Sequence, residues 1–300
     1  MIFEAVAFGL LLPLLAAGIV LVAVGRLGKG GRAVATTVAL VVGFAVGNHF
    51  RPAAEYRIDA DRPLAFGELT AEAIYAVSGT HDKTPHPPAR YWLPWAALFA
   101  GAVGAIAHIP KLPSLVRHLL RALTAIIVAS LLVPLSLRAE APWLWVGFAA
   151  VVLAEWELLD ALGKVDGWLP WGLGLVFLSA GAVLLHAHTA RMTDLATFVA
   201  GGCLGVAVAA RWSGADLRGV APIAAVALPG LLLDGQQSTF SEVPWYSFAL
   251  VALAPLVLIP LVFVPERYRR WRLFAGLGLL LLTAGMAVFL AWWAEPLSFD

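Results

Sequence analysis

The chain has 300 residues, of which 61% are apolar and only 13% are charged, and its mean hydropathy is +0.86. This composition leaves too little polar surface for a soluble globular protein, and a formal net charge of +1 gives no basic surface for nucleic acid. We therefore predict a single all-α integral membrane domain over residues 1–300, with the lipid bilayer as its main partner.

The number of spans follows from the apolar segments. A helix needs roughly 20 apolar residues to cross a hydrocarbon core of ~30 Å. The first segment lacks a preceding basic region and is too long for a signal peptide, so we expect it to be retained. The sequence thus predicts a polytopic bundle of about ten transmembrane helices. They lie near residues 2–25, 33–48, 91–109, 117–137, 142–162, 168–188, 194–211, 219–234, 245–264 and 273–294.

The distribution of Lys and Arg predicts the orientation of these spans. Thirteen of the 20 basic residues fall on one side when the connections are assigned to alternate sides, and basic residues favour the cytoplasm. Both termini are then extracytoplasmic. The 20 comprise sixteen Arg and four Lys, a bias that suits a bacterial source, so we expect a bacterial cytoplasmic membrane.

Two GxxxG motifs predict close contacts between helices. One is formed by Gly43 and Gly47 in the second span, and the other by Gly201 and Gly205 in the seventh. Small residues at this spacing let two helix backbones approach each other. We expect these glycines to serve packing within the bundle.

The connection over residues 49–90 is long and is predicted to lie outside the cell. Its segment AFGELTAEAIYAV places Phe66, Leu69, Ala73 and Val77 on one stripe of a short amphipathic helix. Such a helix would lie on the membrane or cap the bundle. A lid, a docking site for a protein partner and a flexible tether are all compatible with this loop.

The fifth span contains an acidic group inside the membrane. Only fourteen uncharged residues, 141–154, precede Glu155, and that is too short to cross the bilayer. Glu155 must therefore approach the hydrocarbon of the cytoplasmic leaflet. Glu157, Asp160 and Lys164 follow nearer the cytoplasm and share a helix face by their spacing.

Basic residues reach the same depth from neighbouring spans. The third span ends with His108, and the fourth carries His118 and Arg121 near its cytoplasmic end. Because a charge inside a membrane costs ~3 kcal/mol on insertion scales, we expect Arg121 to pair with Glu155 or Glu157. This group is either a proton or cation relay, or a structural ion pair near the interface.

Polar residues also gather at the predicted outer ends of spans. His49 ends the second span, His186 and His188 end the sixth, and Asp234 ends the eighth. These residues would be the ligands of a zinc or copper ion. However, His186 and His188 are two apart on a helix and face nearly opposite ways, and no HExxH motif accompanies them. We expect solvated interfacial histidines and no metal.

Prolines interrupt the eighth and ninth spans at Pro222, Pro229, Pro255 and Pro260. Broken helices near the middle of a membrane are typical of transporter binding sites.

Cys203 is the only cysteine, which excludes a disulfide or an iron–sulfur cluster, and the P-loop and GxSxG motifs are absent from the sequence. No cofactor is expected, and a non-enzymatic function is favoured.

These observations favour a small-solute or ion transporter in which a carboxylate of the fifth span carries protons. Such a protein would have a polar cavity that joins Glu155 to one face. Two alternatives stay open. A scaffold subunit would bind partners through the 49–90 loop or the Arg267–Arg272 cluster and would lack a cavity. A membrane enzyme acting on a lipid-linked substrate would have a groove that opens laterally toward the outer leaflet.

Overall fold

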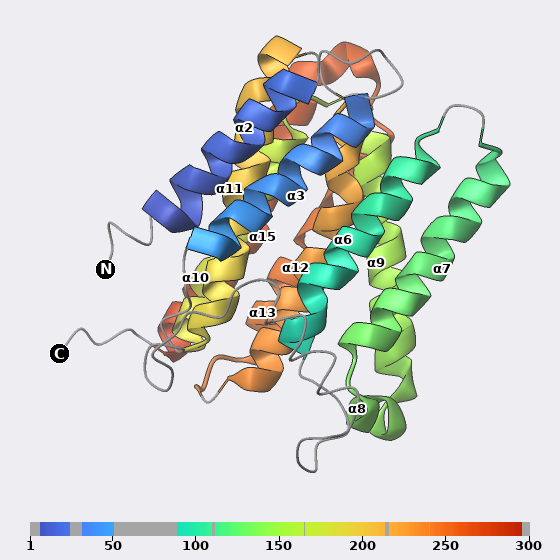
Figure 1. Ribbon diagram of the computed structural model, residues 1–300. Coiled ribbons are helices and arrows are strands. Elements are labelled where there is room, and N and C mark those ends of the chain that lie inside the picture. Colours follow the sequence, from blue (N-terminus) through green and yellow to red (C-terminus); the bar gives the residue numbers. More distant parts are fainter. Residues whose placement is uncertain are drawn as a thin grey trace.

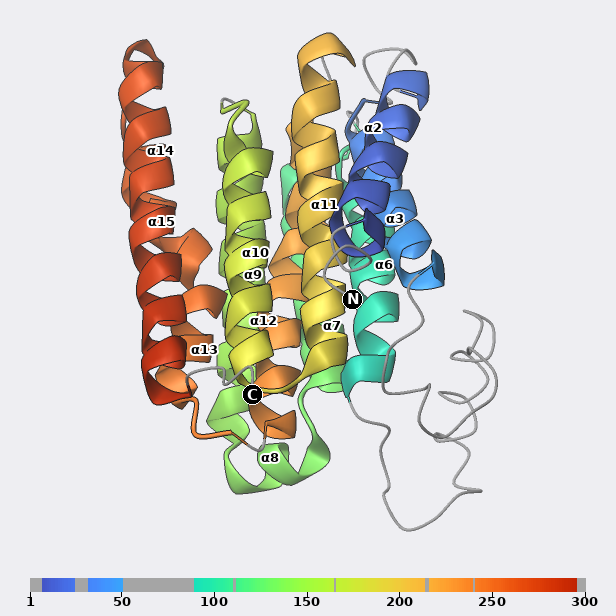
Figure 2. The same cartoon turned by 90° about the vertical axis from the view of Figure 1, so that its left-hand side faces the viewer.

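The computed structural model describes residues 7–24, 32–50, 89–109, 112–164, 166–213, 216–239 and 241–295. Helices contain 89% of these residues, and none of them lies in a strand. The long helices lie side by side with their axes along roughly one direction (Figures 1 and 2). The predicted all-α class is therefore confirmed.

Helical elements run through the whole of the described chain. The first half contains η1 (Ala7–Leu11), α2 (Leu12–Val24), α3 (Arg32–Phe50), α6 (Ala89–Ala107), α7 (Ser114–Leu132), α8 (Leu135–Glu140) and α9 (Pro142–Gly163). The second half contains α10 (Leu169–His186), α11 (Ala190–Ser213), η3 (Leu217–Val220), α12 (Ala221–Ser238), α13 (Trp245–Ala252), η4 (Ala254–Leu258), α14 (Ile259–Val262), η5 (Glu266–Tyr268) and α15 (Arg269–Ala294).

Five described helices are long and apolar enough to cross a membrane. They are Ser114–Leu132, Leu169–His186, Ala190–Ser213, Leu217–Ser238 and Arg270–Ala294. A sixth arises if the pair Trp245–Ala252 and Ala254–Val262, which is bent by 46°, counts as one span. The described chain is thus a helical protein of membrane type with five candidate spans, and the number ten stays a prediction.

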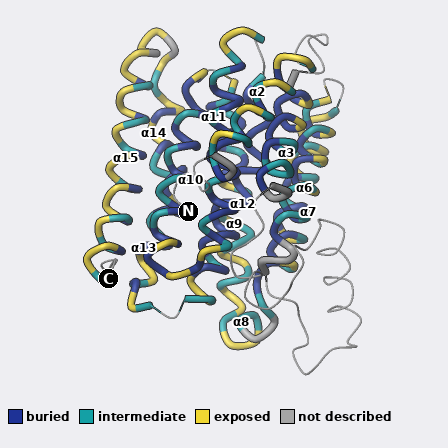
Figure 3. Tube along the Cα trace, turned by 60° about the vertical axis from the view of Figure 1, so that its left-hand side comes forward, coloured by how far each residue is buried: buried dark blue, intermediate teal, exposed yellow. Residues whose placement is uncertain are grey.

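Burial places α12 at the centre of the bundle and α15 at its edge. The span that contains α12 is 89% buried, whereas that of α15 is 22% buried. Much of α15 is exposed (Figure 3). Its exposed side chains are largely apolar, and Phe274 and Leu282 are both 68% exposed. Apolar side chains in such numbers favour a lipid environment over water.

The GxxxG glycines lie where α2, α3 and α11 pack together. A Cβ atom on Gly43 would come within 2.8 Å of the Pro13 carbonyl oxygen, and one on Gly205 would collide with the backbone of Leu14. Only glycine permits this approach, so the predicted packing role of both motifs is confirmed.

The prolines of the two irregular spans have different effects. Pro222 lies in the first turn of α12, and Pro229 lies inside that helix, which nevertheless continues to Ser238. The eighth span is therefore not broken, contrary to expectation. The ninth is broken, because α13 ends at Ala252 and a 46° bend precedes the η4 segment that contains Pro255. The amphipathic helix predicted in the 49–90 loop lies outside the described residues.

Candidate functional site

Five ionisable side chains form a compact group where α6, α7 and α9 meet. We call His108, His118, Arg121, Glu157 and Asp160 the α9 ion-pair cluster. The Arg121 side chain is 1% exposed, and its Nη1 donates to Glu157 Oε2 at 2.7 Å. Its Nη2 lies 3.1 Å from Asp160 Oδ2, so one guanidinium joins two carboxylates.

Each of these two carboxylates also contacts a histidine. His118 Nδ1 lies 2.7 Å from Glu157 Oε1, and His108 Nε2 lies 2.7 Å from Asp160 Oδ1. His108 Nδ1 also faces the Gly104 carbonyl at 2.6 Å. A carbonyl oxygen can only accept, so Nδ1 must donate, and the ring donates to both neighbours only as an imidazolium. The contact between His108 and Asp160 is buried, with side chains that are 4% and 5% exposed.

Helix geometry explains why α9 supplies this cluster. Glu157, Asp160 and Lys164 follow one another at spacings of three and four residues, which places them on one face. Lys164 Nζ lies 3.8 Å from Asp160 Oδ2, at the more exposed rim of the cluster. The predicted convergence of acidic residues of α9 with basic residues of α6 and α7 is thus present in the structure.

Glu155 does not belong to this cluster, although it was one of the two expected partners of Arg121. Residues two apart are turned by roughly 200° around a helix, so Glu155 points away from the side that carries Glu157. Its side chain is 0% exposed. Neither of its carboxylate oxygens has a hydrogen-bond partner among the described residues.

The face of α9 that carries Glu155 is otherwise apolar. Val152, Leu159 and Leu162 lie three, four and seven residues away on the same stripe, and each is 0% exposed. An isolated carboxylate charge in such surroundings costs several kcal/mol unless a proton or a cation accompanies it. The Glu155 carboxyl therefore lies in surroundings that disfavour its charged form.

Trp156 separates the two acidic faces of α9. It is 0% exposed, and the guanidinium carbon of Arg121 lies 5.8 Å from its ring centroid. It also lies close to Gly104, where a Cβ atom would come within 3.4 Å of the indole. This tryptophan thus packs inside the bundle.

An apolar groove of about 250 Å³ approaches Glu155 from the α8 end of the bundle. It lies between α8, α9, α12 and α13 and extends along α9 from Trp143 to Val151, with Pro229 on the opposite wall. Val151 is four residues, or one turn, before Glu155. The groove therefore stops one turn short of the carboxyl, and it is not the polar cavity expected of an open transport path.

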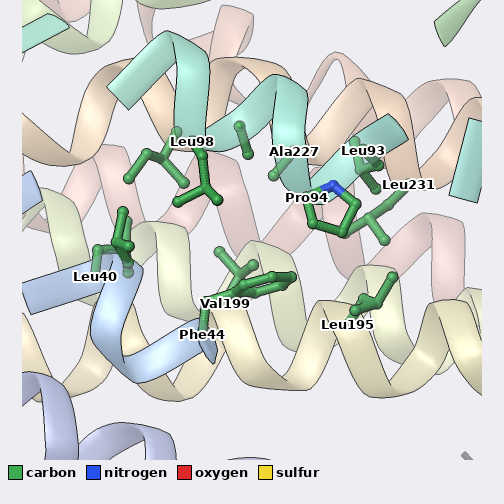
Figure 4. A pocket seen from close by; sticks show the side chains of 12 residues that line it. Leu40, Phe44, Leu93, Pro94, Leu98, Leu195, Val199, Ala227 and Leu231 are labelled. Carbon is green, nitrogen blue, oxygen red and sulfur yellow. The ribbon is translucent and has the colours of Figure 1, made fainter. Parts of the chain in front are cut away.

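A smaller cavity of about 20 Å³ lies between α3, α6, α11 and α12 (Figure 4). Its lining is entirely apolar and includes Phe44, Pro94 and Val199. The space is about that of one water molecule, but it offers no polar partner, so it should stay dry. It supplies no chemistry.

His186 and His188 both contact the C-terminal end of α15. His186 Nδ1 lies 2.8 Å from the Glu295 carbonyl oxygen, and His188 Nε2 lies 3.5 Å from Glu295 Oε1. The side chain of His188 is 58% exposed, whereas His186 is buried at 7% exposure. Burial follows because His186 lies on the inner face of α10 and packs against the end of α15.

No metal arrangement appears around these histidines. Within the described ranges no group of three or more His, Cys, Asp or Glu residues could hold a metal ion. Asp234 is buried in α12 at 3% exposure. The side chain of His49 lies outside the described residues.

A second buried ion pair was not foreseen from the sequence. Asp166, after α9, is 0% exposed and accepts a hydrogen bond of 2.7 Å from Arg272 Nη2 of α15. Arg272 is 4% exposed, so it does not belong to a docking surface, whereas Arg267 and Arg270 are exposed. The only sequence signal was that Asp166 and Arg272 flank spans on the same predicted side.

A third pair caps η3 beside the cluster. The Asp216 carboxylate accepts from the backbone N–H of Arg218 at 3.1 Å and from its Nε at 2.8 Å. Burial by itself would raise the pKa of the Asp216 carboxyl, but the hydrogen bonds from Arg218 outweigh it and hold that pKa below its usual 3.8. Thr36 of α3 donates to the Asp216 carbonyl at 2.8 Å, which ties η3 to α3.

No protein-family model matches the chain, and no curated protein matches it. Its function must therefore be inferred from the geometry described above.

Proposed function

We propose that this protein moves a small solute or an ion across the membrane and that Glu155 binds and releases the accompanying proton. One observation carries the proposal: the Glu155 carboxyl is fully buried without a hydrogen-bond partner among the described residues. A structural carboxylate is normally paired, as Glu157 and Asp160 are. An unpaired one inside a membrane protein is typical of proton and ion pathways.

The proposed topology has ten spans, with both termini outside a bacterial cytoplasmic membrane. The helices reverse direction between consecutive elements, as α6, α7 and α9 do (Figure 1). In this orientation the α9 ion-pair cluster lies toward the cytoplasm, and the groove beside α8 lies toward the outside. The bent pair of α13 with η4 and α14, the shorter apolar helices α2, α3 and α6, and the charged helix α9 complete the proposed count of spans.

The two ends of α9 would then act as the two sides of a gate. On the outer side the groove approaches to within one helical turn of Glu155. On the inner side Arg121 and its two carboxylates close the bundle. The bend between α13 and η4 is the proposed moving part, because a broken helix can change its angle without losing many backbone hydrogen bonds.

The test is proton flux into liposomes that contain the purified protein, with a trapped pH-sensitive dye and an imposed potassium diffusion potential. Glu155→Gln is expected to lower the flux at least tenfold, to the level of empty liposomes, because an amide cannot exchange the proton. Glu140→Gln is the matched control, since Glu140 is exposed on α8. Wild-type flux equal to that of empty liposomes, or an unaffected Glu155→Gln variant, would contradict the proposal.

The role of the groove is tested separately by filling it. Gly147 lines the groove, and no atom lies within 4 Å of a Cβ placed on it, so Gly147→Trp should occupy the space without disturbing the fold. We expect flux to fall by more than half. Gly285→Trp on α15, which has equally open surroundings, should leave flux unchanged. Equal fluxes in both variants would show that the groove is not the path.

The second candidate function is that of a membrane enzyme acting on a lipid-linked substrate. The groove beside α8 favours this function. The groove is apolar, and Trp143 and Trp245, both of which line it, are 69% and 66% exposed. Such a groove could admit an acyl or isoprenoid chain from the bilayer. Under this alternative Gly147→Trp would abolish turnover of the lipid-linked substrate, whereas Glu155→Gln would leave proton flux at the background level of the wild type.

A further inference from the structure

A separate groove lies at the opposite end of the bundle from α8, between α10, α11 and α15. It has a volume of about 600 Å³ and is bordered by Trp168, Trp171, Arg211 and Leu273. Ligand sites in proteins commonly have volumes of roughly 300–1,000 Å³. The groove does not include any residue of the α9 ion-pair cluster or of the groove near Glu155.

Positive charge is concentrated at this groove. Arg211 lines it, and the guanidinium carbon of Arg211 lies 5.7 Å from the Trp171 ring centroid, which fixes its position against α10. Arg270 precedes Leu273 and Leu277 by three and seven residues, so it lies on the same stripe of α15 as these two lining residues. Both arginines are exposed, and neither forms an ion pair with another described residue.

A buried hydrogen-bond donor also borders the groove. Trp168 is 5% exposed, and its indole N–H has no hydrogen-bond partner within the described part of the chain. Buried donors are nearly always satisfied, so an unsatisfied one beside a groove indicates an absent acceptor. The rest of the lining, including Ala207, Leu217 and Leu277, is mostly apolar.

We propose that this groove binds an anionic phospholipid. Its phosphate would accept hydrogen bonds from Arg211 and from the Trp168 indole, Arg270 would add a second positive charge, and an acyl chain would lie against Leu273 and Leu277. Arginine with an apolar wall beside it matches a lipid that has a charged head and an apolar tail. Under the proposed topology, this site lies at the cytoplasmic leaflet.

The experiment measures thermal unfolding of the full chain in nanodiscs of phosphatidylcholine, with and without phosphatidylglycerol. A ligand that binds only the folded protein raises the unfolding temperature. We expect phosphatidylglycerol to raise the wild-type Tm, and Arg211→Gln to remove at least half of that increase. Trp168→Phe, which keeps the ring but lacks the N–H, should also reduce it.

Controls separate a specific site from general attraction to a charged membrane. Arg267→Gln changes the same charge at the same end of the bundle but outside the groove, and it should keep the full increase. Arg211 is exposed, so its substitution should preserve the fold, which helical circular dichroism in phosphatidylcholine verifies.

An equal loss of the Tm increase in Arg211→Gln and Arg267→Gln, or no Tm increase in the wild type, would overturn the proposal. So would an equal rise with inorganic phosphate in phosphatidylcholine nanodiscs, because the ligand would then be free phosphate. Glu155→Gln should keep the lipid response, so this result is independent of proton flux.

Discussion

Glu155 and Glu157 are two residues apart on α9 and have opposite environments. Glu157 is 34% exposed at its side chain and pairs with Arg121 and His118, each at 2.7 Å. Glu155 is fully buried and has no hydrogen-bond partner among the described residues. The rotation of roughly 100° per residue in a helix is enough to move one carboxyl into an ion-pair cluster and the other into an apolar face.

This difference shows which carboxylate suits which role. A paired group stabilises the fold and has little reason to change its protonation during function. A buried carboxyl without a partner lowers stability, but such a group is suited to ion or proton binding. The following experiments test whether the two faces of α9 differ in this way.

The largest effect is expected for Arg121→Gln. Removal of this guanidinium leaves Glu157 and the buried Asp160 without their shared partner, and breaking a buried pair costs about 3–5 kcal/mol. Unfolding of the purified protein in mixed micelles with increasing denaturing detergent measures the loss. Arg267→Gln, at an exposed position, should cost less than ~0.5 kcal/mol, as ordinary surface substitutions do. Equal effects at the two positions would show that the cluster does not stabilise the bundle.

Glu155→Leu is expected to stabilise the protein, whereas Arg121→Gln should destabilise it. Burial of an unsatisfied polar group costs about 1–3 kcal/mol, so replacing it with an apolar side chain should raise the free energy of unfolding by about 2 kcal/mol. The same unfolding assay applies, and proton flux should be lost at the same time. A destabilised Glu155→Leu variant would mean that Glu155 has a structural partner and would weaken the comparison with Glu157.

The smallest effect concerns Asp216, a paired carboxylate outside the α9 cluster. Its folded-state pKa lies below its unfolded value, so its pairing with Arg218 stabilises the fold above about pH 4 and is lost as pH falls through the folded pKa. Asp216→Asn keeps the cap but removes the charge that pairs with Arg218, so it should cost about 0.5–1 kcal/mol at neutral pH and less in acid. Unfolding measured between neutral pH and pH 3 tests this, with Glu140→Gln as the control. A cost that does not change with pH would exclude the charged pair.

Much of the architecture could be predicted from the sequence alone. Composition and apolar segment length indicated an all-helical membrane protein, because lipid requires every backbone group to be paired within a helix. Spacing along α9 also predicted that Glu157 and Asp160 would meet basic residues of α6 and α7. The GxxxG contacts followed from the small size of glycine. These features are local, so periodicity and residue size suffice to predict them.

Other features depend on how the helices face one another, and only the tertiary structure decided them. Arg121 had two candidate partners in the sequence, and the rotation of α9 against α7 selected Glu157 and excluded Glu155. Pro229 leaves α12 continuous, whereas the segment around Pro255 is bent, although both prolines predict an interruption. The pair of Asp166 and Arg272 joins residues 106 positions apart. Sequence patterns determine what each helix can bury, but the packing of one helix against another determines which charges meet and which stay alone.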